Sequence, residues 1–257
     1  MSIMKETATV IYQREISPGI FDMEISFPDG AAQAKPGQFV GIYCKDGGRL
    51  LPQPISICGI DKAKGTIRIV YRIAGSGTKE ISGWKEGDHF EILGPLGNGF
   101  SPGKNRAIIV GGGIGVPPML ELARQMEGEK TVVLGYRDSG SMFLKEEFEA
   151  IADVKISTDD GSAGIHGTVV DAIREYGLVG DTIYACGPMP MLKALAEYAR
   201  EHGMEAQISL EERMACGVGA CLGCIVKTNS KDHHTNVNNR RICKDGPVFD
   251  AKEVSFS

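Results

Sequence analysis

Four cysteines near the carboxyl end constrain this chain more than any other feature. Cys216, Cys221 and Cys224 lie within nine residues in the spacing Cys-x4-Cys-x2-Cys, and Cys243 follows after a further eighteen residues. This spacing is typical of plant-type [2Fe–2S] sites. Glycines among the first three cysteines let the chain curl, so that backbone N–H groups can point at sulfur and stabilise a negative cluster. We therefore predict that these four thiolates bind a [2Fe–2S] cluster.

A structural zinc site is the alternative occupant, because four cysteines can also bind zinc. Zinc sites of this kind usually combine two Cys-x2-Cys pairs. This chain has one such pair, Cys221 and Cys224, and Cys243 stands alone, so zinc is the less favoured metal. His233 and His234 lie in the polar stretch NSKDHHTNVNN, and we expect them to be solvated loop residues and not ligands.

The composition argues against several classes of protein. The formal net charge is −5, and no block of lysine and arginine offers a surface for nucleic acid. No apolar run approaches the roughly 20 residues that span a bilayer. The first residues, MSIMKETATVIYQRE, lack the apolar core of a secretory signal. We expect a cytoplasmic protein, whose thiols are ligands, catalytic groups or buried side chains and not disulfides.

The chain changes character twice along its length. Short β-branched and aromatic runs, separated by turn residues, fill the first 100 residues and indicate a β-barrel or sandwich, with one short helix near Thr78–Trp84. After the polar stretch FSPGKNR, apolar strands alternate with helices, which predicts a parallel, doubly wound α/β sheet. The alternation stops where the cysteine-rich tail begins. We expect three domains, at 1–102, 103–208 and 209–257.

Two strand-to-helix turns in the α/β region can approach a ligand closely. The first, IIVGGGIGVPPM, contains Gly111, Gly112, Gly113 and Gly115. A glycine-rich turn at the start of a helix favours phosphate, although Val116 occupies the last glycine position of the common dinucleotide fingerprint. The second turn, YACGPMPM, falls on the same carboxyl edge of the sheet. Its cysteine, Cys186, is expected to face the crevice, and burial as a small thiol is the alternative.

Taken together, these motifs resemble those of the ferredoxin-NAD(P)+ reductase family. GGGIGVPPM and CGPMPM are similar to its nicotinamide-dinucleotide motifs, QPISI to its flavin motif and GSGT to its flavin-pyrophosphate loop. The resemblance implies a β-barrel that binds FAD, followed by a domain that binds NAD(H). The implied FAD residues are Gln53, Pro54, Ile55, Ser56, Val70, Tyr71, Arg72, Gly77 and Thr78. The implied NAD(H) residues are Gly111, Gly112, Gly113, Gly115, Val116, Pro117, Cys186, Gly187, Pro188 and Met189.

The same resemblance implies roles for individual residues and shows one departure. Ser56 is expected near flavin N5 and Cys186 beside the nicotinamide, as the residues of the hydride-transfer site. The family's flavin motif starts with arginine, whereas this chain has Gln53. A charge-assisted bond to phosphate is thereby lost, and Arg49 or Arg72 could compensate for it.

The tail ERMACGVGACLGC followed by CKDGPVFD resembles the electron-transfer subunits of class 1B dihydroorotate dehydrogenases, a branch of the same family. This resemblance implies FAD, a [2Fe–2S] cluster and NAD(H), and an FMN-containing catalytic partner in a heterotetramer with two copies of each subunit. The small subunit of an electron-bifurcating NADH-dependent ferredoxin:NADP+ oxidoreductase is a second similar protein. An acidic residue commonly replaces the first cluster cysteine there, so Cys216 favours the dihydroorotate system.

Two further points stay open at this stage. Arg137 and Asp138 follow the strand KTVVLGY, where a cation favours a 2′-phosphate and an acid repels it. NAD is favoured on family grounds alone. A different class of function, a non-enzymatic interaction module with a structural zinc, stays possible until the metal is known.

Overall fold

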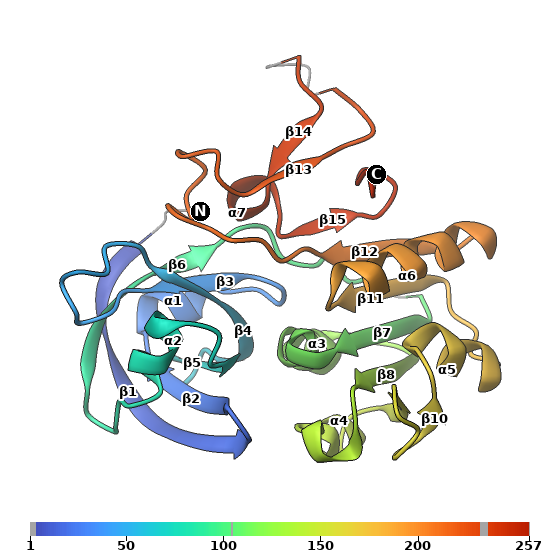
Figure 1. The fold of residues 1–257 in the computed structure, drawn as a ribbon, viewed down its shortest axis with the longest axis horizontal. Coiled ribbons are helices and arrows are strands. Elements are labelled where there is room, and N and C mark those ends of the chain that lie inside the picture. The colour runs from blue at the N-terminus through green and yellow to red at the C-terminus, as the bar shows by residue number, and fades with distance from the viewer. Residues whose placement is uncertain (1–3, 104, 232–235, 257) are drawn as a thin grey trace.

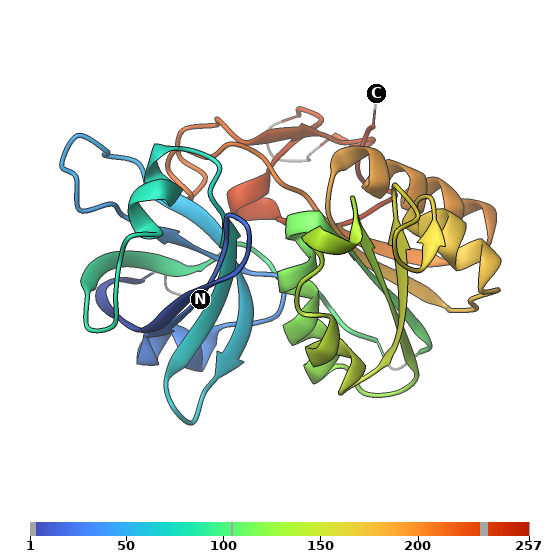
Figure 2. The same cartoon turned by 60° about the horizontal axis from the view of Figure 1, so that its bottom comes forward.

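The computed structural model describes residues 4–103, 105–231 and 236–256 (Figure 1). His233 and His234 lie outside the described residues. A β-barrel and an α/β domain stand side by side, and the cysteine-rich segment lies across the top of both (Figures 1 and 2). The predicted fold class, a barrel followed by a doubly wound α/β domain and a cysteine-rich tail, is confirmed.

The barrel is closed, antiparallel and filled by side chains from alternate positions of its strands. Its core is dominated by isoleucines, among them Ile25, Ile57, Ile67, Ile69 and Ile92, each at most 1% exposed. The strands follow the order β1 (Met4–Ser17), β2 (Ile20–Ser26), β5 (Thr66–Arg72), β4 (Gln53–Asp61), β3 (Phe39–Ile42) and β6 (His89–Leu96), and β6 pairs back with β1.

Two short helices, α1 (Pro28–Gln33) and α2 (Ser76–Ile81), accompany the barrel. Helix α2 begins earlier than the predicted range Thr78–Trp84. The cause is local, because the hydroxyl oxygen of Thr78 accepts hydrogen bonds from the backbone N–H groups of Ala74 and Gly75 and closes the first turn.

The α/β domain contains a seven-stranded sheet. Its first six strands in spatial order are parallel, as the alternation of strands and helices predicts. Helices α3 and α4 pack on one face, and α5 and α6 pack on the other. The strand order is β10 (Ile165–His166), β9 (Asp153–Thr158), β8 (Lys130–Tyr136), β7 (Ala107–Gly112), β11 (Thr182–Cys186), β12 (Glu205–Ser209) and β15 (Val248–Asp250). The helices are η1 (Gly113–Gly115), α3 (Val116–Gln125), η2 (Ser139–Ser141), α4 (Lys145–Glu149), α5 (Val169–Glu175) and α6 (Met189–Glu201).

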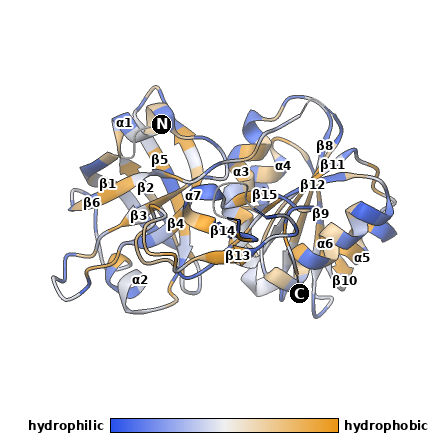
Figure 3. Cartoon of the chain, turned by 90° about the horizontal axis from the view of Figure 1, so that it is seen from above, coloured by the Kyte–Doolittle hydropathy of each residue, from blue (hydrophilic) through white to orange (hydrophobic). Residues whose placement is uncertain are grey.

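The cysteine-rich segment is joined to the α/β domain by its last strand. Strand β15 pairs antiparallel with β12 at the edge of the large sheet. The rest of the segment forms the hairpin of β13 (Ile225–Lys227) and β14 (Asn239–Arg241), followed by α7 (Ile242–Asp245). Seen from above, this hairpin and α7 lie between the barrel and the α/β domain (Figure 3). The segment therefore shares a sheet and a core with the preceding domain.

The barrel also contacts both of its neighbours directly. Ile20, Cys58 and Val70 belong to the apolar core that lies under α3. The side-chain amide of Asn98, just after β6, donates hydrogen bonds to the backbone carbonyls of Lys244 and Asp245. These contacts hold the three parts around a common junction. In the described ranges, no helix has the length and apolar character to cross a membrane.

Candidate functional site

A cavity of about 250 Å³ lies where the three parts of the molecule meet. The barrel supplies one wall, and most of the residues that the resemblance assigns to the flavin lie in it together: Pro54, Ile55 and Ser56 from β4, Val70, Tyr71 and Arg72 from β5, and Thr78 from α2. The opposite wall consists of Ile114 from the glycine-rich turn and of Ser209 at the end of β12, followed by Leu210, Glu211, Glu212 and Met214. The apolar side chains of Pro54, Ile55 and Val70, together with the polar groups of Ser56, Arg72 and Thr78, suit a flavin.

Gln53 and Gly77 lie against each other beside this cavity. A Cβ on Gly77 would lie 2.4 Å from Cδ of Gln53, so only glycine lets the glutamine cross the start of α2. Nε2 of Gln53 donates to the carbonyl of Leu51 at 3.2 Å. Among the cations considered as substitutes for the missing arginine, Arg49 pairs with Glu80, whereas Arg72 lines the cavity.

The sequence interpretation did not include the wall formed by the residues at and after the end of β12. Glu211 is the notable member of this wall, because it is an exposed residue that lines the cavity and carries a carboxyl group close to other protein atoms. This crowding raises the pKa of the Glu211 carboxyl, and Arg72 acts in the opposite direction. Its position directly after the last parallel strand was the one signal that could have identified it, since ligands bind at that edge of such sheets.

A second cavity, of about 480 Å³, lies at the carboxyl edge of the parallel strands. It is lined by the ends of β7, β8 and β9 and by the starts of α5 and α6. The two predicted turns do meet here: Gly112 and Gly113 come from the first, and Pro188 from the second. Arg137 and Asp159 add polar groups. This is the edge where dinucleotides bind in α/β sheets.

The other residues of the two turns determine how closely the turns approach. A Cβ on Gly115 would lie 2.4 Å from the carbonyl oxygen of Cys186. A Cβ on Gly187 would lie 2.5 Å from Cε of Met191. Gly111, Val116 and Pro117 are buried beneath the turn, whereas Met189 is exposed at the start of α6. The two turns therefore need glycine to form a single cavity.

Cys186 ends strand β11 and is 1% exposed. Its side chain packs in the core beneath the two turns. Burial strongly raises the pKa of the Cys186 thiol, so the sulfur stays protonated. The side chain of Cys186 thus supports the turn that carries Gly187 and Pro188. Its backbone carbonyl is the group that Gly115 approaches.

The four tail cysteines form two pairs. Sγ of Cys216 accepts hydrogen bonds from the backbone N–H groups of Val218, Ala220 and Cys221, at 3.5, 3.3 and 3.4 Å. Sγ of Cys224 accepts one from the N–H of Cys243 at 3.4 Å. Among the described residues, no group of three or more His, Cys, Asp and Glu side chains is arranged to hold one ion. Each iron of a [2Fe–2S] cluster takes two cysteine ligands, so two pairs of cysteines match its ligand set.

The electrostatics of the chain itself favour anionic sulfur at Cys216 and oppose it at Cys243. Burial opposes ionisation of Cys216, but the backbone N–H groups outweigh it and lower the pKa of this thiol to about 6. Burial and the neighbouring Cys224 raise the pKa of Cys243 to about 12. A bound cation favours thiolates at both positions. The curl depends on left-handed backbone at Gly217 and Gly219, with φ of 69° and 83°. The donor set therefore fits a [2Fe–2S] cluster.

Fold and site together define a reductase of the ferredoxin-NAD(P)+ reductase type with an added iron–sulfur domain. Residues 109–197 match the oxidoreductase NAD-binding domain, and residues 211–255 match the iron–sulfur cluster binding domain of dihydroorotate dehydrogenase B. The chain belongs to the family of dihydroorotate dehydrogenase B electron transfer subunits, which confirms the recognition made from the motifs.

Full-length relatives support this assignment. The electron transfer subunit of dihydroorotate dehydrogenase B (NAD(+)) from Geobacillus thermodenitrificans is 44% identical over 260 residues, covering 98% of this chain and 99% of the relative. The one from Streptococcus mutans is 42% identical, with 98% of each chain covered. A solved NADH-dependent reduced ferredoxin-NADP oxidoreductase, studied for flavin-based electron bifurcation, matches with a TM-score of 0.86 and 30% identity, over 96% of this chain and 89% of that one.

Proposed function

We propose that this chain carries electrons between a catalytic subunit that oxidises dihydroorotate and NAD+. One observation carries the proposal. Met214 lines the flavin cavity, and Cys216, the first cluster ligand, follows two residues later. The flavin cavity and the first candidate cluster ligand are thereby adjacent on one short segment, while the dinucleotide cavity lies on the other side, at Gly113. The chain forms a path from the cluster through the flavin to NAD.

Each part of the path has its own task. Bound FAD exchanges a two-electron hydride for single electrons, which a [2Fe–2S] cluster can take up. Pro54, Ile55 and Val70 provide the apolar wall for its ring, Ser56 a hydroxyl beside it and Arg72 a positive charge. The cysteine pairs hold the cluster in the overlying segment. Their backbone N–H donors stabilise its negative charge.

The names of the relatives imply a catalytic partner. We propose that this partner is an FMN-containing dihydroorotate dehydrogenase subunit and that the complex contains two copies of each chain. In pyrimidine biosynthesis, electrons from the partner's FMN would then reach the cluster held by the tail cysteines and pass through FAD in the barrel cavity to NAD+. We also propose the cytoplasmic location expected from the sequence, because cysteines there stay reduced and can act as cluster ligands.

The division of labour can be tested on the isolated chain. The purified holoprotein should reduce an artificial dye with NADH and should form no orotate from dihydroorotate. Orotate formation by this chain alone would refute the division. Anaerobic co-purification from the native cells distinguishes the two similar systems, since a large bifurcating subunit in place of a dihydroorotate dehydrogenase would identify the other.

The preference for NAD is also a proposal. Arg137 lines the dinucleotide cavity, and its Nε donates to the carboxylate of Asp138 at 2.8 Å. This pairing offsets the charge that a 2′-phosphate needs, and Asp159 on the same cavity repels one. Comparing kcat/KM for NADH and NADPH in the dye assay tests this, and a preference for NADPH would contradict it.

A further inference from the structure

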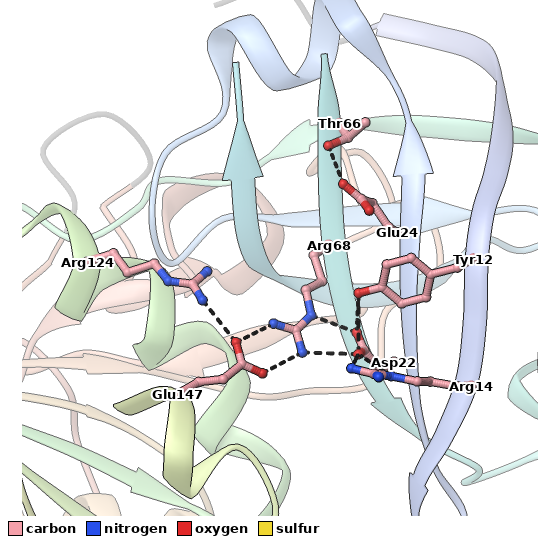
Figure 4. A network of polar contacts seen from close by, with 8 residues as sticks. All are labelled: Tyr12, Arg14, Asp22, Glu24, Thr66, Arg68, Arg124 and Glu147. Atoms are coloured by element: carbon pink, nitrogen blue, oxygen red, sulfur yellow. Dashed lines mark hydrogen bonds and ion pairs between the residues drawn. The ribbon is translucent and has the colours of Figure 1, made fainter. Parts of the chain in front are cut away.

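We propose that a charged clamp, formed by Arg68 of the barrel with Glu147 and Arg124 of the α/β domain, sets the orientation of the two domains and thereby the approach of nicotinamide to flavin. The inference rests on the proposed function, because it concerns hydride transfer between NAD and FAD. None of these three residues lines the flavin cavity or the dinucleotide cavity, so they act as positioning residues. Figure 4 shows the clamp spanning the boundary between the barrel strands and helices α3 and α4.

The clamp itself is a forked ion pair. Nη1 and Nη2 of Arg68 donate to Oε2 and Oε1 of Glu147 at 2.6 and 2.8 Å. Nη2 of Arg124 donates to Oε2 of the same carboxylate at 2.9 Å. Burial acts to raise the pKa of Glu147, but the bonds from Arg68 outweigh it and hold the pKa below its usual value. A forked arginine–carboxylate pair fixes direction as well as distance.

A buried carboxylate holds Arg68 in place on the barrel side. Asp22 is 0% exposed and accepts hydrogen bonds from Nε and Nη2 of Arg68 at 2.7 and 3.1 Å. Tyr12 and Arg14 also donate to this carboxylate. The guanidinium therefore uses one edge for Asp22 and another for Glu147 (Figure 4). Because Asp22 cannot move into water without loss of its partners, Arg68 is a rigid part of the barrel.

The clamp is connected to both cofactor cavities through the backbone. Arg68, Val70 and Arg72 lie on one face of β5, and the last two line the flavin cavity. Across the boundary, Arg124 lies on α3, the helix that the glycine-rich turn begins. Helix α4, with Glu147, is tied to the dinucleotide cavity because the hydroxyl of Tyr136 donates to the carbonyl of Phe143 at 2.6 Å.

A second polar contact crosses the same boundary. Oε2 of Glu121 on α3 accepts the N–H of Ile60 on β4 at 3.1 Å. Between the two polar contacts, Cys58 and Val70 pack into the core under α3. Apolar contact is not directional, so it can hold the domains together without fixing their angle. The directional contacts across this boundary are therefore the Glu121 hydrogen bond and the charged fork, and the forked pair is the stronger of the two.

Glu147→Gln is the informative substitution, because it keeps the shape of the side chain and removes its charge. Glu149→Gln is the matched control, since Glu149 lies on the same helix and pairs with Lys145 of that helix at 2.6 Å. The holoprotein of each variant is mixed rapidly with NADH. We expect flavin reduction to slow by about 10-fold or more for Glu147→Gln, with little change in NADH affinity, since a displacement of about 1 Å can cost about 100-fold. Glu149→Gln should match the wild type.

Hydrogen exchange of the Ile60 amide gives a readout that needs no turnover. Glu147→Gln should exchange faster at Ile60 than the wild type, because the boundary opens more often. Arg124→Gln removes one of the three bonds to Glu147 and should shift both readouts in the same direction by a smaller amount. It replaces Glu147→Gln if that variant does not fold.

The clamp would be overturned if Glu147→Gln and Arg124→Gln kept the flavin reduction rate and the Ile60 exchange rate of the wild type. It would also be overturned if Glu149→Gln slowed flavin reduction as much as Glu147→Gln. Failure of the wild type to be reduced by NADH would refute the proposed function, and the Ile60 exchange would then decide the clamp alone.

Discussion

Replacing Gln53 with arginine should tighten the retention of FAD. The glutamine crosses Gly77 at the start of α2, beside the flavin cavity, and offers a neutral amide. A hydrogen bond to a charged group contributes about 1.5–3 kcal/mol and a neutral one about 0.5–1.5 kcal/mol. The difference of roughly 1–2 kcal/mol corresponds to a Kd for FAD that is about 5- to 30-fold lower. No Cβ at position 77 hinders the longer side chain.

Titration of the flavin-free protein with FAD, followed by flavin fluorescence, measures this effect. Gln33→Arg is the control, because it adds the same charge on α1, away from the cavity. It should leave the Kd within about twofold of the wild type, as expected for a distant, screened charge. Equal Kd values for the wild type and Gln53→Arg would refute the reasoning and would assign the phosphate's partner to Arg72, which lines the cavity.

Three further predictions follow from the site. Gly115→Ala should weaken NADH binding and lower the thermal stability, because its Cβ would meet the Cys186 carbonyl at 2.4 Å, and both are measured by NADH titration and thermal unfolding. Glu121→Gln should be more stable than the wild type at pH 8, and this difference in stability should be smaller at pH 4. Burial raises the pKa of Glu121, so its contribution to stability is present below its unfolded pKa and lost as the pH rises through the folded pKa. Cys224→Ser should lose iron and the visible cluster absorbance while keeping FAD.

Matched variants separate these effects from general damage. Gly47→Ala has open space around its Cβ and should behave as the wild type in NADH binding and unfolding. Cys44→Ser removes a thiol outside the tail and should keep its iron. Unchanged NADH affinity in Gly115→Ala, a stability difference for Glu121→Gln that does not grow from pH 4 to pH 8, or full iron content in Cys224→Ser would contradict the corresponding prediction.

Local patterns were sufficient for much of the fold and for part of the site. The cysteine spacing and the glycine-rich turns are largely local signals, because three of the four cluster cysteines and each phosphate turn lie within a few residues. They predicted the iron–sulfur tail and the turns that meet at the carboxyl edge of the sheet. The flavin strands needed the family resemblance, since a sequence such as QPISI is also an ordinary strand.

Long-range contacts were beyond what the sequence could predict. Glu211 lines the flavin cavity because the chain after β12 passes beside the barrel, and its position after the last parallel strand indicates a ligand edge but not which cavity it joins. The pairing of β15 with β12 depends on a later return of the chain. Arg68 and Glu147 are 79 residues apart, and each reads as an ordinary exposed charge in its own segment. Only the packing of the two domains shows that they form a pair.

Iron analysis and paramagnetic resonance of the anaerobically purified protein test the central claim most directly. The account predicts equal amounts of iron and acid-labile sulfide, about two of each per chain, and a signal of a reduced [2Fe–2S] cluster after addition of dithionite. A colourless protein with zinc and no iron, silent in the resonance experiment, would contradict the account and would support an interaction module in its place.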